Sequence, residues 1–303
     1  MRQIMALEGA GRGLADAGLE GTPGAAAAGW VGRLQIDCRR DGARTVSHDR
    51  HEGPLRVLQP LYPEGPGICH HVLVHPPGGV VGGDRLYIDI TAHAGSHALI
   101  TTPGATRFYR SDGPRALQHA RLRLAAGARL EWLPLESIAY PGCRATSIVE
   151  AVLAPGAEMI GWELLALGLP AAGRPFDAGW FCQHLELPGR WLERGVIDGQ
   201  DRTLIDSPLG LAGHKVLATL WFAAGQPLPP AQREALLAAA REAAAAHGLA
   251  ATAGATAPQP EVVVLRVLAP RVEPAAQLLA AVRAAWRRLA WDLAAEPPRI
   301  WRT

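Results

Sequence analysis

A short turn pattern recurs three times in the middle of the chain, and it restricts the fold more than any other feature of the sequence. A small residue, a glycine and a second small residue stand at 94–96, 126–128 and 155–157, each time after a stretch with strand character. A glycine there supplies a turn residue of positive φ, and we expect an antiparallel strand pair to flank each turn. The glycines lie 32 and 29 residues apart, which favours stacked supersecondary units, as in a solenoid or an elongated sandwich. An ordinary run of hairpins would explain the spacing almost as well.

Hydrophobic periodicity predicts the strands around these turns. Residues 32–38, 85–91 and 121–124 alternate between polar and apolar side chains, which is the period of a half-buried strand. Residues 261–268 are typical of a further, more apolar strand. The middle of the chain is therefore predicted to be β.

Helix signals are confined to the last third of the chain. A run of strong helix formers at 231–247 follows two prolines and is closed by a glycine. A second stretch, 274–292, carries apolar residues at helical spacing. Between these helices, residues 248–260 are rich in Gly, Ala, Thr and Pro and are predicted to form a linker.

The predicted architecture is mainly β, elongated and stacked, with two main helices in the C-terminal third. Residues 1–29, rich in Gly and Ala, are expected to be a poorly ordered extension. Residues 30–303 are expected to form a single domain, β-rich over 30–225 and helix-containing over 226–303.

Charge and cysteine content exclude several functional classes. The chain has 30 Lys and Arg residues against 28 Asp and Glu, so it lacks the basic excess of a nucleic-acid or anionic-membrane binder. No stretch has the roughly 18 consecutive apolar residues of a spanning helix, and the N-terminus lacks a signal-peptide core. The four cysteines are scattered without a CxxC pair. We therefore expect a cytoplasmic protein that binds neither nucleic acid nor membrane.

The common enzyme signatures are absent from the sequence. There is no GxSxG nucleophile elbow and no HExxH zinc helix. The glycine-rich segment 78–84 lacks the Lys-Ser/Thr of a phosphate-binding loop. It is not a dinucleotide fingerprint either, because the segment after it, 85–91, is predicted to be a strand instead of a helix.

A histidine cluster leaves a metal-dependent hydrolase open as an alternative. His70, His71 and His75 lie close in sequence. In a strand, however, residues four apart are separated by about 13 Å, which is too far for one metal ion with ligands at about 2 Å. A structural or partner-facing role is favoured over metal ligation. A β-rich binding module without any metal role is a further alternative.

Five segments, in their order along the chain, resemble the urease accessory protein UreD family, called UreH in some bacteria. The resemblance covers about 29–303. The segments that carry it are HPPGGVVGGDRL at 75–86, TTPGATRFYRS at 101–111, EWLPLESI at 131–138, GWELLALG at 161–168 and PRIWRT at 298–303.

The resemblance implies a fold and a function. Members of the family are elongated, mostly β proteins with a β-helix-like or stacked-sheet fold, and they are not enzymes. It implies a maturation factor that binds the apo-urease subunits and recruits UreF and, through it, the GTPase UreG. Two Ni²⁺ ions are then inserted and the bridging lysine of urease is carbamylated. No tightly bound cofactor is expected, only transient Ni²⁺.

Within that resemblance, four residues are candidates for transient nickel passage. They are Asp84, Glu136, Glu163 and His75. Nickel accepts imidazole and carboxylate ligands, and isolated carboxylates along a β scaffold suit weak, reversible binding. The alternative for each acid is that it accepts hydrogen bonds from loop N–H groups.

The C-terminal residues Arg299, Ile300 and Trp301 are a candidate anchor for UreF, because Trp and Arg are favoured at interface hot spots. The alternative is that Trp301 packs on its own domain.

Overall fold

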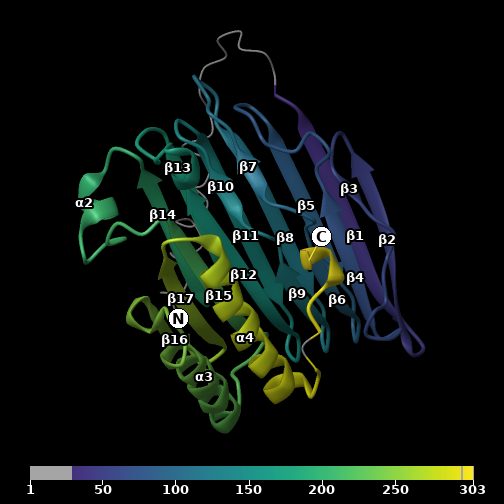
Figure 1. The fold of residues 1–303 in the computed structure, drawn as a ribbon. Helices are drawn as coiled ribbons and strands as arrows, with labels where there is room; N and C mark the ends of the chain where they lie inside the picture. The colour runs from purple at the N-terminus through teal and green to yellow at the C-terminus, as the bar shows by residue number, and fades with distance from the viewer. Residues whose placement is uncertain (1–28, 295, 303) are drawn as a thin grey trace, which may run out of the picture.

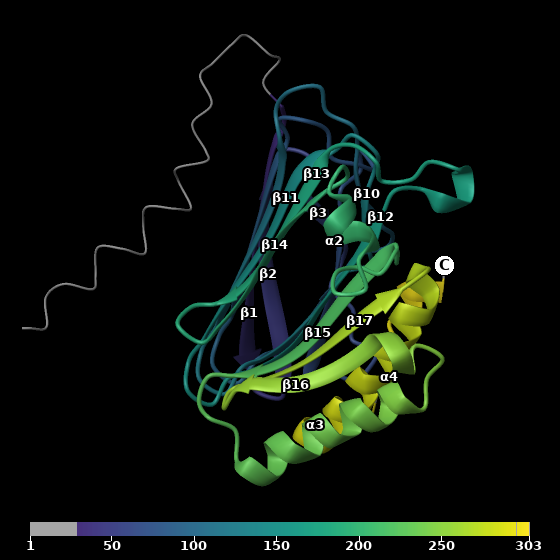
Figure 2. The ribbon, with the colours of Figure 1, turned by 90° about the vertical axis from the view of Figure 1, so that its left-hand side faces the viewer.

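The structure, a computed structural model, describes residues 29–294 and 296–302. Two β-sheets face each other, and helices α3 (Pro230–Ala245) and α4 (Val272–Trp291) cover the outer face of one sheet (Figures 1 and 2). The mainly β fold with two long C-terminal helices is confirmed. The expected extension at 1–29 lies, except for Gly29, outside the described residues.

The first sheet has seven strands in the order β14-β13-β11-β8-β5-β1-β2. Its strands are β1 (Val31–Asp41), β2 (Arg44–Glu52), β5 (Arg85–Ala92), β8 (Ala116–Leu124), β11 (Arg144–Leu153), β13 (Trp180–Leu187) and β14 (Trp191–Asp198).

The second sheet has ten strands, with the main order β16-β17-β15-β12-β9-β6-β4-β3 and with β10 linking β12 to β7. Its strands are β3 (Arg56–Val57), β4 (Ile68–Val74), β6 (His97–Thr101), β7 (Thr106–Phe108), β9 (Arg129–Leu133), β10 (Ser137–Ala139), β12 (Glu158–Leu167), β15 (Val216–Ala224), β16 (Ala253–Gln259) and β17 (Val262–Ala269). The short helices are η1 (Pro170–Ala172), α2 (Arg202–Asp206), η2 (Ala250–Thr252) and η3 (Arg299–Arg302).

The three repeated turns stack on one another and connect the two sheets. Gly95, Gly127 and Gly156 have φ values of 69°, 69° and 76°, in the left-handed region that glycine tolerates best. A Cβ on Gly127 would lie 3.9 Å from the Gly95 nitrogen, and one on Gly156 would lie 3.6 Å from the Gly127 nitrogen. The solenoid-like stacking favoured by the spacing is therefore confirmed.

The expected antiparallel pair around each turn is wrong. The strand before each turn (β5, β8 or β11) lies in the seven-stranded sheet, and the strand after it (β6, β9 or β12) lies in the ten-stranded sheet. Each strand pairs in parallel with its counterpart from the next repeat. The backbone hydrogen bonds are thus satisfied between repeats, and the space between the sheets is filled by side chains.

The linker expected at 248–260 is also wrong, since most of it forms η2 and the edge strand β16, which pairs with β17. Tertiary pairing overrides the weak strand propensity of its Gly, Ala and Pro residues. Among the described residues, no helix combines the length and apolar character needed to cross a membrane.

The ten-stranded sheet has two buried faces, which separates the core into two clusters. On β12, Met159 and Leu165 point between the sheets, whereas Trp162 and Leu164 pack toward the helices. Alternation along the strand therefore sends Glu163 into the space between the sheets.

Candidate functional site

Glu163 is a carboxylate buried in the middle of the protein. Its residue is only 5% exposed, and its Oε1 lies 3.5 Å from the indole Nε1 of Trp132 on β9. Burial raises the pKa of Glu163 to about 7, and the Trp132 indole and the Gln183 side chain from the facing sheet offset only part of that effect. The neighbours Trp162 and Leu164 do not surround this carboxylate, because they lie on the other face.

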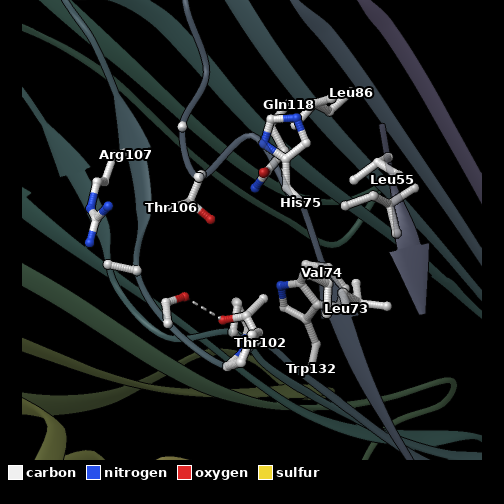
Figure 3. Close-up of a pocket in the computed structure, with 17 residues that line it drawn as sticks. Leu55, Leu73, Val74, His75, Leu86, Thr102, Thr106, Arg107, Gln118 and Trp132 are labelled. Carbon is white, nitrogen blue, oxygen red and sulfur yellow. Dashed lines mark hydrogen bonds between the residues drawn. The ribbon is translucent and has the colours of Figure 1, made fainter. Parts of the chain in front are cut away.

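A cavity of about 230 Å³ lies between the two sheets, and Trp132, the hydrogen-bond partner of Glu163, is one of its lining residues. It is large enough for several water molecules, since one water needs only about 10–15 Å³ of such space. Its walls are apolar, with polar groups at separated positions (Figure 3). The polar side chains that line it are His75, Thr102, Thr106, Arg107 and Gln118.

Trp132 joins the cavity to Glu163. Its side chain lines the cavity, and its indole N–H points to the Glu163 carboxylate. At the rim, Gly78, Gly104 and Arg107 are exposed to solvent. The cavity is therefore open at an exposed rim, and the Trp132 side chain lies between it and the Glu163 carboxylate.

His75 lies on the wall of this cavity, just beyond the end of β4. Burial lowers its pKa, and the charge of Asp84 counteracts this only in part. A neutral imidazole can act as a metal ligand. Of the four candidate nickel residues, His75 thus lines the cavity, whereas Glu163 hydrogen-bonds only to Trp132 among the residues that line it.

Asp84 is held in a turn by its own hydrogen bonds. Its Oδ1 accepts a hydrogen bond from the Trp30 backbone N–H at 2.8 Å, and its Oδ2 accepts one from the Val81 N–H at 3.0 Å. Both oxygens are therefore used in joining the 81–84 turn to the start of β1. This geometry favours the hydrogen-bonding alternative for Asp84. Glu136 lies half-buried in the loop between β9 and β10.

We expect Asp84→Asn to lower the free energy of unfolding by about 1–3 kcal/mol, because the amide NH₂ faces a backbone N–H that then lacks an acceptor. Urea unfolding would measure the loss. Asp112→Asn is the matched control, since Asp112 is 82% exposed and pairs only with exposed Arg110. Equal stability of Asp84→Asn and the wild type would contradict the structural role.

The histidine cluster does not converge on one metal. His70 faces the helices and bonds Glu64 at 2.8 Å, whereas His71 faces the other way, with its Nε2 3.3 Å from the Cys69 sulfur. Strand alternation separates these two neighbours. Their placement gives no support to a hydrolase centre built on His70, His71 and His75.

A buried charge network between β9 and α4 was missed by the sequence reasoning. Glu131 is fully buried; its Oε2 accepts from the Arg283 Nε at 2.6 Å and its Oε1 from the Arg287 Nη1 at 2.5 Å. Arg287 also binds Glu64, and His97 lies 3.6 Å from Glu131. The only available signal was Glu131 inside the motif at 131–138, because nothing local points to partners more than 150 residues away.

Electrostatics keep this network ionised. Burial alone would raise the pKa of Glu131, but the Arg283 guanidinium, the His97 side chain and Arg287 together hold it well below its usual range. Glu64 behaves in the same way, because His70 and Arg287 overcome the effect of burial and lower its pKa. The network therefore anchors α4 on the ten-stranded sheet through charged hydrogen bonds.

The C-terminal segment folds back onto the same sheet. The Trp301 indole N–H donates to the Thr101 hydroxyl at 2.8 Å, and its ring centroid lies 5.1 Å from that of Trp162. Trp301 thus packs on its own domain, the alternative raised from the sequence. Ile300 lines a cavity of about 580 Å³ next to β4, and Arg299 is exposed.

Trp301→Ala is expected to lower the free energy of unfolding by about 2 kcal/mol, less than the 3–5 kcal/mol typical of a fully buried aromatic. The loss combines the Thr101 hydrogen bond and the contact with Trp162. Trp30→Ala is the control, because Trp30 is 62% exposed and should change stability by less than about 0.5 kcal/mol. Similar denaturation midpoints for the two variants would refute this packing role.

The comparisons with a family model and with individual known proteins agree on one family. Residues 31–302 match the model of the UreD urease accessory protein family. The urease accessory protein UreD of Variovorax paradoxus is 61% identical over 274 residues, covering 90% of this chain and 99% of that protein. The protein of the same name from Leptothrix cholodnii is 62% identical over 276 residues, with the same coverage. One from a Polaromonas species is 58% identical over 272 residues.

Proposed function

The chain belongs to the UreD urease accessory protein family, and on this premise we propose that it is a non-enzymatic maturation factor that carries Ni²⁺ toward apo-urease. In this proposal it acts in the cytoplasm as a scaffold that binds the urease subunits, UreF and, through UreF, UreG. Urease maturation is the role that the family supports. The partners and the nickel route are the finer part of the proposal.

The observation that carries the nickel route is the placement of Glu163. A carboxylate in apolar surroundings costs free energy unless it is paired or neutralised. Glu163 has a weak 3.5 Å hydrogen bond from Trp132 and an interaction with the Gln183 side chain, and among the described residues no Lys, Arg or His forms an ion pair with it. A buried carboxylate of this kind lowers the stability of the protein. A role in binding Ni²⁺ would explain why the protein has it.

The chemistry of the interior suits a weak nickel path. Ni²⁺ would meet the His75 imidazole at the cavity wall and then the Glu163 carboxylate on the far side of Trp132. The cavity wall also carries hydroxyl and amide groups, from Thr102, Thr106 and Gln118. Because the pKa of Glu163 is about 7, protons compete with nickel for this carboxylate near neutral pH. Competition keeps binding reversible, as transfer requires.

The test is co-expression of this chain with the urease subunits, UreF and UreG, followed by affinity purification. We expect the chain to recover urease subunits and UreF together, and the urease to contain nickel. Omission of this chain should leave the urease nickel-poor and inactive. Urease that is fully loaded with nickel in its absence would overturn the maturation role, and failure to recover UreF would overturn the proposed partner.

A second experiment tests whether the C-terminal segment binds UreF. Arg299, Ile300 and Trp301 are proposed as an anchor for UreF; Arg299 is exposed, and the other two are half-buried. Arg299→Ala should weaken recovery of UreF without changing the denaturation midpoint. Unchanged recovery of UreF with this variant would remove the segment from the interface.

A further inference from the structure

Four metal-ligating side chains gather on the outer face of the seven-stranded sheet, away from the interior cavity. His119 lies on β8, Glu150 on β11, and His184 and Glu186 on β13. These three strands are adjacent and parallel, with Glu150 directly opposite Glu186. His119 and His184 lie directly opposite Ile148, one on each neighbouring strand. Glu150 and Glu186 are two residues further along their strands, and residues two apart share a face, so all four side chains lie on one face of the sheet.

We propose that Glu150, His184 and Glu186 form a binding site for a divalent transition-metal ion such as Ni²⁺ or Zn²⁺. One ligand atom from each of these residues lies within 4.8 Å of those of the other two. Two ligands that each contact such an ion at about 2.1 Å are about 3.4 Å apart in tetrahedral coordination, so a separation of 4.8 Å is closed when each of the two moves by about 0.7 Å. Side-chain movements of less than about 1 Å would therefore complete the site.

The ligand set selects the class of ion. One imidazole and two carboxylates suit borderline metals such as nickel and zinc better than calcium or magnesium, which prefer oxygen ligands alone. The remaining coordination positions would be filled by water, because the side chains of the three ligands are 17–35% exposed. The site is therefore open to solvent and accessible to a free ion.

A fourth residue holds one of the ligands in place. The His119 Nε2 lies 3.0 Å from Glu150 Oε2. His119 is on β8, so it approaches Glu150 from the side of β11 that faces away from β13. This hydrogen bond lowers the pKa of Glu150. The His184 Nε2 lies 2.8 Å from Glu186 Oε2 in the ion-free protein. A metal ion bound to the His184 Nε2 would take the place of this direct contact with Glu186.

The charge of the ligand set itself favours a cation. The site holds two carboxylates, and Arg121, which lies directly opposite Glu150 on β8, is paired with Asp89 at 2.8 Å. Arg194 stands opposite His184 across β13 and β14 and is exposed. The two carboxylates of the ligand set attract an ion of charge +2.

The experiment measures Ni²⁺ and Zn²⁺ binding to the full-length protein by competition with a chromophoric chelator. We expect His184→Ala, and separately Glu150→Gln, to weaken one binding event at least tenfold. The matched control is His93→Ala. His93 bonds Asp37 at 3.1 Å on the same face of the same sheet, but no third ligand joins this pair among the residues that the structure describes, so its loss should leave binding unchanged.

Two outcomes overturn the site: no measurable binding of either ion to the wild type, or equal binding by the wild type, His184→Ala and Glu150→Gln. Because the ligands are on the surface, both variants should keep the wild-type circular dichroism spectrum, and Glu186→Gln provides a third test if one does not. Glu163→Gln should leave this binding event intact, which separates the surface site from the interior path. Anomalous scattering at the nickel edge should then place the ion between β11 and β13.

Discussion

Replacing Glu163 by glutamine should make the protein more stable above pH 7 while the urease it matures becomes poor in nickel. The stability gain follows from the pKa, which is about 7 in the folded protein and 4.5 for an ordinary glutamate. Between these values the unfolded chain has released a proton that the folded protein keeps, so wild-type stability falls as pH rises from 4.5 to 7. The loss amounts to about 3 kcal/mol above pH 7.

Glutamine has no such proton equilibrium, so the difference between variant and wild type should be small near pH 4 and grow to about 3 kcal/mol by pH 8. Urea unfolding at a series of pH values measures it. A flat difference across this range would contradict the raised pKa. The same experiment on Glu163→Asp, which keeps a carboxylate, should retain the pH dependence.

The nickel effect is measured on urease recovered from the full complex. Loss of the carboxylate should lower its nickel content and activity by about tenfold or more, the size typical when a metal-site partner is removed. The complex itself should still form, because Glu163 is buried and its side chain is not part of the protein surface that a partner would contact. Fully loaded urease with Glu163→Gln would eliminate the passage role, and Glu163→Asp should restore part of the loading.

Replacing Arg287 by methionine should lower the free energy of unfolding by about 3–5 kcal/mol. Arg287 is fully buried and neutralises two acids at once, Glu131 and Glu64. Without it, only Arg283 and His97 are left to compensate Glu131, and among the described residues Glu64 keeps only His70 as a partner. The large cost comes from leaving charge buried without a counter-charge, more than from the lost attraction.

The control for this variant is Arg266→Met. Arg266 pairs with Glu193 at a site where the two side chains are 47% and 25% exposed, so its loss should cost less than about 1 kcal/mol. Both variants are compared by urea denaturation at pH 7. If Arg287→Met unfolds at the same urea concentration as Arg266→Met, the network does not hold α4 on the sheet.

Local periodicity in the sequence was enough to predict most of the secondary structure. Alternation at 32–38 and 85–91 corresponds to β1 and β5, and the proline-to-glycine stretch at 231–247 corresponds to α3. The three turn glycines were identified from their spacing, and all have positive φ. These features depend on residues close together in the chain, so a single sequence is enough to predict them.

The pairing of the strands was decided by tertiary structure. The same turn residues serve a hairpin and a turn between sheets, so the sequence left both architectures open. In the folded protein each strand finds its hydrogen-bond partner in the next repeat, about 30 residues away, because the two strands around a turn belong to facing sheets.

The character of the site divides in the same way. Glu163 and His75 were singled out from the sequence through a family resemblance. The sequence alone could not predict that Glu163 points between the sheets, or that both carboxylate oxygens of Asp84 accept hydrogen bonds from backbone N–H groups. The Glu131 network was invisible because its arginines lie 152 and 156 residues further along the chain. A buried charge is tolerable only beside its counter-charge, and packing α4 on β9 is what brings these charges together.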